Sequence, residues 1–219
     1  PDYIGSNLKT VGRDGLFVKK IQRLFKEGRN KEAEEECEKL LGDGDKKAMG
    51  SYLAFGELQF EFFKMKKNRI FDYFRYLDLR TAISHVEYKY EDERGEISTY
   101  KREYFASYPD NVICIKFSVD SSSKKMAIKS RFIPSNAAIT KIEKNEITIE
   151  GELEDNDMKF NGKLAVAIKD GFIQLKKDSI LIENTSEVVF FVSGSTDYKN
   201  VYPKYRTGET NEELNLRVQ

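Results

Sequence analysis

The stretch HVEYKYEDERGEISTYKREYFASYPDNVICIKFSV, residues 85–119, decides the fold class of this chain. Apolar and polar side chains alternate along it with a period of two, which is typical of β-strands that bury one face. Two turn signals interrupt the alternation, Glu93-Arg94-Gly95 and Pro109-Asp110-Asn111. The stretch therefore predicts antiparallel strands joined by hairpins.

The same period continues on both sides of this stretch. It begins in GELQFEFF, residues 56–63, and resumes after residue 119 in these segments: KMAIKSRF, AAITKIE, EITIEGEL, MKFNGKLAVAI, FIQLKK, SILIE and EVVFFVSGS. Further turn signals stand between these segments: Lys144-Asn145, Asp155-Asn156, Asp170-Gly171 and Glu183-Asn184. Many short strands with turn signals between them, and no helical pattern, favour an antiparallel β-sandwich over alternating β and α units. The continuous apolar run at residues 188–192 predicts a central strand that is buried on both faces.

The first fifty residues follow a helical period instead. The first predicted helix has apolar residues at helical spacing: Phe17, Ile21, Leu24 and Phe25. Gly28 stands where a left-handed residue would end it. A second, acidic helix has its own apolar face: Ala33, Cys37, Leu40 and Leu41. Because this pair offers no basic recognition face, we interpret it as a packing element and not as a DNA-binding motif.

Composition excludes several classes of function. The 219 residues hold 37 basic and 37 acidic side chains, so the formal net charge is zero. This balance predicts no nucleic-acid partner and no membrane surface as a partner. No apolar run approaches the roughly 20 residues that span a bilayer. The N-terminus shows no signal peptide, so both a cytoplasmic and a secreted location stay open.

Residues that usually hold metals or cofactors are sparse and badly spaced. Cys37 lies in a helical pattern and Cys114 in a strand pattern, so we expect two shielded free thiols and not a disulfide or a metal pair. His85 is the single histidine and has no partner at metal-ligand or triad spacing. We expect no metal and no cofactor.

Catalytic signatures are missing as well. The sequence contains no GxGxxG, P-loop, HExxH or GxSxG motif. The acidic segments 91–96 and 150–159 are interpreted as charged hairpin tips, since the second lacks the spacing of an EF-hand loop. We therefore predict no catalytic residue in this chain.

Five tyrosines leave two interpretations open. They alternate along the predicted strands and form this set: Tyr76, Tyr88, Tyr90, Tyr100 and Tyr104. Such rings can form a platform for a sugar, but alternating strand tyrosines more often pack in the core or pair across strands. We favour the core interpretation.

Four segments in order resemble one known family. The helical segment IQRLFKEGRNKEAEEECEKLLGD (residues 21–43) is similar to its helical insertion, and SYLAFGELQFEF (51–62) to its Y-Q-P-L-G-D-L loop. FDYFRYLDLRTAISHVEYKY (71–90) and TYKREYFASYPDNVICIKF (99–117) resemble two of its strand motifs. The chain thus resembles the N-terminal domain of glycoside hydrolase family 95, the α-L-fucosidases.

The resemblance implies a fold and a role. Residues 51–197 would form the sandwich, residues 1–50 an inserted helical pair of the same domain, and residues 198–219 a polar linker toward a downstream (α/α)6 barrel. Inverting hydrolysis with two carboxyl functions would take place in that barrel. This chain would brace the barrel and shape one wall of the substrate cleft. The alternative is a stand-alone carbohydrate-binding sandwich.

Three residues receive specific expectations. Tyr52 and Glu57 flank the glycine through which the loop enters the first strand, so we expect them at an end of the sandwich that faces the barrel or the substrate cleft. Arg102 alternates with Glu103 on its strand, and we expect it to pair with an acid on a neighbouring strand.

Overall fold

The computed structural model describes most of the chain. The described residues are 16–41, 54–63, 65, 69–120, 125–154, 156–201 and 204–218. None of the helices in these ranges has the length and apolar character needed to cross a bilayer.

The predicted helical pair is present as α1 (Leu16–Lys26) and α2 (Asn30–Leu41). Ile21, Leu24 and Ala33 are buried together, and Cys37 packs against them. The chain turns at Gly28, whose φ of 73° is left-handed, as the sequence predicted. Phe25 is largely exposed and does not join this core. The side chains of three other predicted members lie outside the described residues: Phe17, Leu40 and Leu41.

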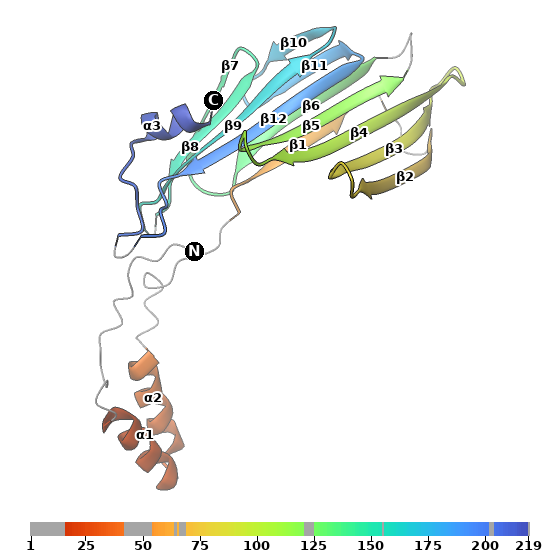
Figure 1. The fold of residues 1–219 in the computed structure, drawn as a ribbon. Coiled ribbons are helices and arrows are strands. Elements are labelled where there is room, and N and C mark those ends of the chain that lie inside the picture. The colour runs from red at the N-terminus through yellow and green to blue at the C-terminus, as the bar shows by residue number, and fades with distance from the viewer. Residues whose placement is uncertain are drawn as a thin grey trace. The chain divides into compact units, whose positions relative to one another are not determined.

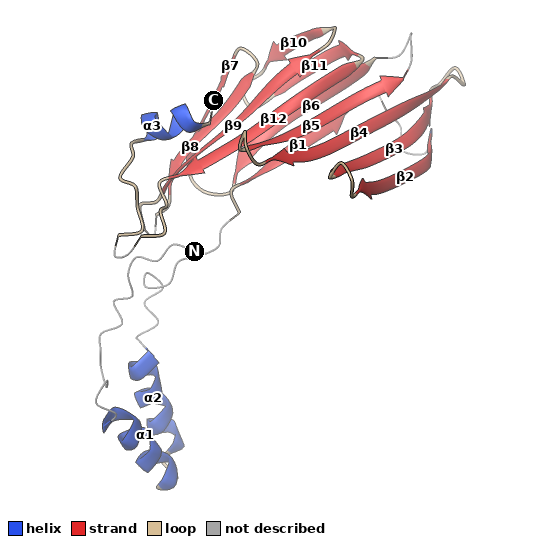
Figure 2. Cartoon of the chain, in the orientation of Figure 1, coloured by secondary structure: helices blue, strands red, loops and turns tan. Residues whose placement is uncertain are grey.

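The remaining described residues are mainly β, and the predicted sandwich is confirmed. The strands are β1 (Gly56–Phe62), β2 (Ile70–Asp78), β3 (Ile83–Glu91), β4 (Ile97–Ser107), β5 (Val112–Asp120), β6 (Met126–Pro134), β7 (Ala138–Glu143), β8 (Glu146–Glu152), β9 (Lys159–Ile168), β10 (Phe172–Leu175), β11 (Ile180–Thr185) and β12 (Glu187–Thr196). Figure 2 shows them as two layers of arrows.

The two sheets are unequal in width within the described residues. The smaller has four strands in the order β1-β6-β11-β10, and the larger has eight in the order β2-β3-β4-β5-β12-β9-β8-β7. Every pairing within them is antiparallel. Figure 1 shows β2 and β7 at opposite edges of the larger sheet. A narrow sheet over a wide one leaves part of the wide sheet without a covering layer.

Turn residues predicted from the sequence adopt left-handed backbone conformations. Gly95, Asn111, Lys144, Gly171 and Asn184 all have positive φ between 52° and 87°. Glycine and asparagine adopt this region at low cost, which is why such residues mark hairpins. The hairpin turns of the sandwich are therefore local properties of the sequence.

The core between the sheets is built on aromatic rings. The Phe60 ring of β1 lies 5.2 Å from Phe117 of β5 and 4.6 Å from Phe190 of β12, measured between ring centroids. Phe117 and Phe190 are themselves 5.6 Å apart. These rings join the small sheet to the large one, and offset or edge-on packing of this kind is favourable beyond the area buried.

The run at residues 188–192 is central but is buried on one face only. β12 pairs with β5 on one side and β9 on the other, as expected for a central strand. Phe190 faces the other sheet and is fully buried, whereas Phe191 faces outward and is 40% exposed. The prediction of burial on both faces was wrong, because Phe191 lies on the outer face of the larger sheet, which the smaller sheet does not cover.

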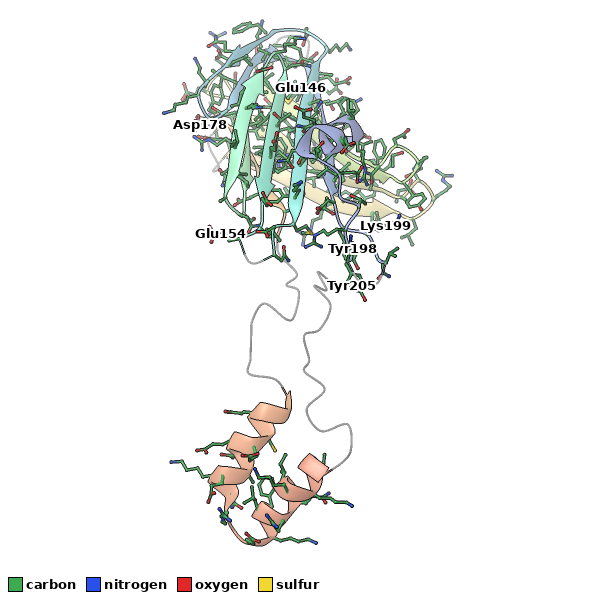
Figure 3. All side chains as sticks on the ribbon, turned by 90° about the vertical axis from the view of Figure 1, so that its left-hand side faces the viewer. Glu146, Glu154, Asp178, Tyr198, Lys199 and Tyr205 are labelled. Carbon is green, nitrogen blue, oxygen red and sulfur yellow. The ribbon has the colours of Figure 1, made fainter. Side chains whose placement is uncertain are left out.

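The segment after β12 contains ordered structure. Residues 198–208 begin with a bridge between Tyr198 and Arg206, and the backbone N–H of Lys199 donates to the carbonyl oxygen of Tyr205 at 3.2 Å. Figure 3 labels Tyr198, Lys199 and Tyr205 in this segment. The segment belongs with residues 1–53 and 154–158 to one compact unit of the chain.

A short helix, α3 (Asn211–Arg217), closes the chain. Thr210 and Glu213 form a reciprocal capping box, and the backbone N–H of Thr210 holds the pKa of the Glu213 carboxyl below its usual range. Leu214 is buried, and its carbonyl oxygen accepts from the Ser195 hydroxyl at 3.2 Å. This helix lies within the segment 198–219 that we expected to be a linker.

The sandwich unit comprises residues 54–153, 159–197 and 209–219. The other unit includes the helical pair. The expected division, with residues 1–50 as part of the same domain as the sandwich and residues 198–219 as a linker, stays a prediction.

Candidate functional site

The two residues predicted at an end of the sandwich, Tyr52 and Glu57, are only partly described. Tyr52 lies outside the described residues. Glu57 is the second residue of β1, is exposed, and accepts a hydrogen bond from the Gln59 amide at 3.0 Å. Together with Gln59 and Glu61 of β1 and two basic residues of β6, it lines an open hollow on the outer side of the small sheet. The predicted interdomain role of Glu57 stays a prediction.

The acidic segments form structured turns. Asp92 accepts hydrogen bonds from the backbone N–H groups of Arg94 and Glu96, both at 2.9 Å. Asn156 likewise accepts from the backbone N–H of Met158 at 2.9 Å. Among the described residues, no three histidine, cysteine or acidic side chains are grouped closely enough to hold a metal ion. The described part of these segments supports their interpretation as hairpin tips.

Both thiols are free, as expected. Cys37 is partly buried in the helical pair, and Cys114 is buried on β5. Burial raises the pKa of the Cys114 thiol, which disfavours the reactive thiolate form.

The inner face of β2, β3 and β4 carries a ladder of tyrosines. Tyr88 and Tyr100 lie directly opposite each other, and their rings stack with centroids 5.5 Å apart and planes 5° apart. Tyr73 of β2 continues the stack at 6.4 Å from Tyr88. Tyr88 and Tyr100 are buried, but Tyr73 is 59% exposed at the edge of the sheet.

Arg102 lies against this ladder and not against an acid. Its guanidinium carbon is 4.5 Å from the centroid of the Phe62 ring, and its Nη2 donates to the Tyr88 hydroxyl at 3.3 Å. The prediction that Arg102 pairs with an acid was wrong, because Arg102 faces the aromatic layer between the sheets. Burial lowers the pKa of Arg102, but the phenol groups of Tyr88 and Tyr104 together raise it above its ordinary value.

The outer face of β2 carries a second set of rings. Phe71, Phe74 and Tyr76 are all exposed there, and the Tyr76 ring stacks on His85 of β3 with centroids 4.6 Å apart. Strand β2 is therefore aromatic and exposed on both faces. We treat this edge of the larger sheet, with its inner and outer faces, as the candidate functional region.

The five tyrosines considered in the sequence analysis differ in how far they are buried. Tyr88, Tyr90 and Tyr100 are buried, which confirms the core interpretation for them. Tyr104 is half-buried, and burial raises its pKa against the opposing effect of Arg102. Tyr76 is exposed. Tyr73, Phe71 and Phe74 were not predicted from the sequence as site residues, although the aromatic density of FDYFRY was a visible signal.

Comparison with known proteins gives a family match and a structural neighbour. The sequence matches the family model for the glycosyl hydrolase family 65 N-terminal domain over residues 9–201. A solved structure of a protein assigned as a kojibiose phosphorylase from the human microbiome is similar at 12% identity, with a TM-score of 0.50 over 74% of this chain. The match covers 24% of that protein's chain. No protein with a curated description matches.

These findings correct the expected family. The match is to family 65, and neither comparison supports family 95 or an α-L-fucosidase. The motifs that suggested family 95 are strand and turn patterns. In the structure, Asp78 accepts from the backbone N–H of Arg80 at 2.9 Å, and Tyr88 packs in the core. Such residues specify a sandwich and carry no information about the sugar that an attached enzyme cleaves.

Proposed function

Because the chain belongs to the family of glycosyl hydrolase family 65 N-terminal domains, we propose that it is a non-catalytic domain that braces a catalytic barrel of the same polypeptide. Family 65 catalytic domains are (α/α)6 barrels. The solved relative is about four times as long as the region that this chain matches, which leaves ample length for such a barrel in that protein.

The observation that carries this proposal is a group of exposed apolar side chains on the inner face of the larger sheet. We name it the open inner face and define it by Tyr73 and Leu77 of β2 and Ile113 of β5. All three are exposed although they share a face with core residues such as Phe117 and Phe190, according to the strand register. Tyr73 and Leu77 lie three strands away from β5, on which β1 packs through the contact of Phe60 with Phe117. Ile113 lies at the beginning of β5, away from that contact.

Exposed apolar surface of this kind favours a protein partner. Burying it would release free energy at roughly 25 cal/mol for each Å² of apolar area. Leu79 and Tyr108, in the turns that end β2 and β4, are also highly exposed and extend the apolar surface at one end of the sheet. We propose that the barrel covers the open inner face and these turns, with Tyr52 and Glu57 near the same contact.

The substrate of the complete polypeptide is a further part of the proposal. The similarity to a protein assigned as a kojibiose phosphorylase makes kojibiose with inorganic phosphate the first pair to test. The domain would position the barrel and shape one wall of its substrate cleft, while the reacting groups belong to the barrel.

The chain on its own is expected to release no sugar from kojibiose with inorganic phosphate, or from an aryl α-glucoside with water. Enzymic rate enhancements require at least about 8 kcal/mol of oriented transition-state stabilisation. Glu57 is exposed on β1 and Asp92 is held in a turn by backbone N–H groups, whereas inverting hydrolysis needs two carboxyl groups that face each other across the sugar in a cleft. The measurement is glucose or aryl release by the purified chain.

The same assay on single-acid variants provides the control. Turnover that is present in the purified chain and abolished by Glu57→Gln or Asp92→Asn would overturn the non-catalytic assignment. Residual turnover that survives both changes would have to be traced to a contaminating enzyme by repeating the purification with a different tag.

A further inference from the structure

We propose that the outer face of β2 is a binding surface for a neutral gluco-oligosaccharide, a function that goes beyond the bracing role. We name this surface the ring row and define it by Phe71, Phe74 and Tyr76. It lies on the opposite face of the strand from the open inner face. The two surfaces can therefore act independently.

Two rings of the row, those of Phe74 and Tyr76, are exposed and close to each other. Phe74 is 61% exposed and Tyr76 is 44% exposed, and their centroids are 5.3 Å apart with planes inclined at 36°. Neighbouring pyranose rings in an oligosaccharide repeat at a similar interval. The C–H groups on one side of a pyranose form an apolar patch that stacks on an aromatic face.

The row is supported from the neighbouring strand. The Tyr76 ring lies nearly parallel to the ring of His85, its cross-strand partner on β3, at 4.6 Å and 12°, so one of its faces is covered and the other is turned away from β3. His85 is itself half-buried, and its Nδ1 lies 3.8 Å from an oxygen of Glu103 on β4. A ring fixed in this way loses little conformational entropy when a sugar stacks on it.

A β-bulge brings the third ring onto the same face. The register of β2 against β3 shifts between Phe71 and Phe74, and Asp72 has a φ of 50°. Without the extra residue, two positions three apart would face opposite sides of the sheet. The Asp72 carboxylate pairs with the Lys89 ammonium at 2.8 Å, which stabilises the bulge.

Polar side chains border the row on one side. On the outer face, β3 and β4 present His85 with Glu103, and Glu87 with Lys101 at 3.5 Å. These groups supply both hydrogen-bond donors and acceptors beside the rings. A sugar needs this combination, because its apolar faces are surrounded by hydroxyl groups.

The same border argues against a protein occupant. The apolar strip is one strand wide, and the charged pairs begin on the next strand, whereas the cores of protein interfaces are depleted of charged residues. Edge pairing with a second copy is opposed by the bulge at Asp72, since a bulge interrupts the free edge that another strand would have to follow.

The test is a calorimetric titration of the chain with maltoheptaose and, separately, with cellohexaose. We expect at least one of the two to bind with a Kd of about 1 mM or tighter. The double variant Phe74→Ala, Tyr76→Ala should weaken that binding at least about tenfold. Tyr76→Phe, which keeps the ring, should bind nearly as well as the original chain.

A matched control comes from the other face of the same strand. Tyr73→Ala removes an equally exposed ring from the open inner face and should leave sugar binding unchanged. Absence of heat with both sugars, or binding that the double variant retains, would overturn the proposal. So would a dimer, measured by sedimentation, that only the double variant converts to monomer, because the row would then be a protein interface.

Folding and the bracing role are checked separately. The circular dichroism spectrum and melting curve of the double variant should match those of Tyr73→Ala, since both sets of rings are exposed. A variant that fails this comparison is replaced by Tyr76→Ser alone, for which the same loss of binding is expected. Sugar binding does not depend on a barrel, so its failure leaves the proposed bracing function intact.

Discussion

Replacement of Phe190 by alanine is expected to lower the free energy of unfolding of the sandwich by about 3–5 kcal/mol. Phe190 has no exposed surface and contacts the rings of Phe60 and Phe117, so it packs against side chains of both sheets. Truncation would remove these contacts and leave a cavity that the paired strands on both sides cannot close. Urea denaturation followed by circular dichroism measures the loss.

The adjacent Phe191 supplies the control. It has the same side chain on the same strand but faces outward with 40% of its surface exposed, so Phe191→Ala should cost less than about 1.5 kcal/mol. Equal losses for the two variants would show that the alternation of β12 has been assigned to the wrong faces.

Replacement of Gly171 by alanine is expected to cost at least about 2 kcal/mol. Gly171 joins β9 to β10 with a φ of 87°, a conformation that strains any residue with a Cβ atom. An added Cβ would also overlap the carbonyl oxygen of Glu183 and lie 2.6 Å from that of Asn184, and neither backbone atom can move without disturbing the turn after β11.

Gly95→Ala separates backbone strain from steric overlap. Gly95 also has a left-handed φ, of 79°, but the nearest atom to an added Cβ is a Glu91 side-chain oxygen at 3.9 Å. This variant should lose only about 1 kcal/mol. Thermal and urea unfolding of both variants provide the comparison, and an equal loss would mean that the overlap at Gly171 is relieved by local movement.

The sandwich could be predicted because strands and turns are specified by residues that are close together in the sequence. Alternation placed most strands, and residues such as Asn111 and Lys144 marked turns that do adopt positive φ. Strand β2 was not predicted from alternation of apolar and polar residues. The bulge at Asp72 adds one residue, so the rings at positions 71, 74 and 76 share a face without following a period of two. A two-residue period cannot detect a strand whose phase changes in the middle.

The width of each sheet could not be read from the sequence. The run at residues 188–192 suggested burial on both faces, but exposure of Phe191 depends on which layer covers β12. Helix α3 was also missed, although Thr210 and Glu213 stand at capping-box spacing. Leu214 is the buried residue of the helix, and Val218 at its C-cap is also buried, but two such positions are too few to form a visible apolar face within a polar segment.

The candidate functional region at β2 could not be predicted for the same reason, since the sequence does not show which strands the small sheet covers. The sequence distinguished neither Tyr76, which is exposed, from Tyr88, which is buried, nor the two faces of β2 from each other. The first distinction arises because Tyr76 lies on the outer face of the larger sheet, whereas Tyr88 lies on the inner face that packs against the small sheet. The second arises because the small sheet has too few strands to cover β2. The functional interpretation of this edge therefore rests on the tertiary arrangement of the sheets and not on any single motif.

The central claim, that the open inner face is covered by a catalytic barrel, is tested most directly by thiol labelling at Tyr73→Cys. The maleimide reaction rate is measured in this chain and in the longest polypeptide that its gene encodes. Ile139→Cys, on β7 at the opposite edge of the larger sheet, is the exposed control, and the unsubstituted protein gives the background from Cys37 and Cys114. We predict that Tyr73→Cys reacts at least about tenfold more slowly in the longer polypeptide while Ile139→Cys does not change, since burial excludes the reagent. Equal reaction rates of Tyr73→Cys in the two proteins, or a gene that encodes no barrel, would contradict the account.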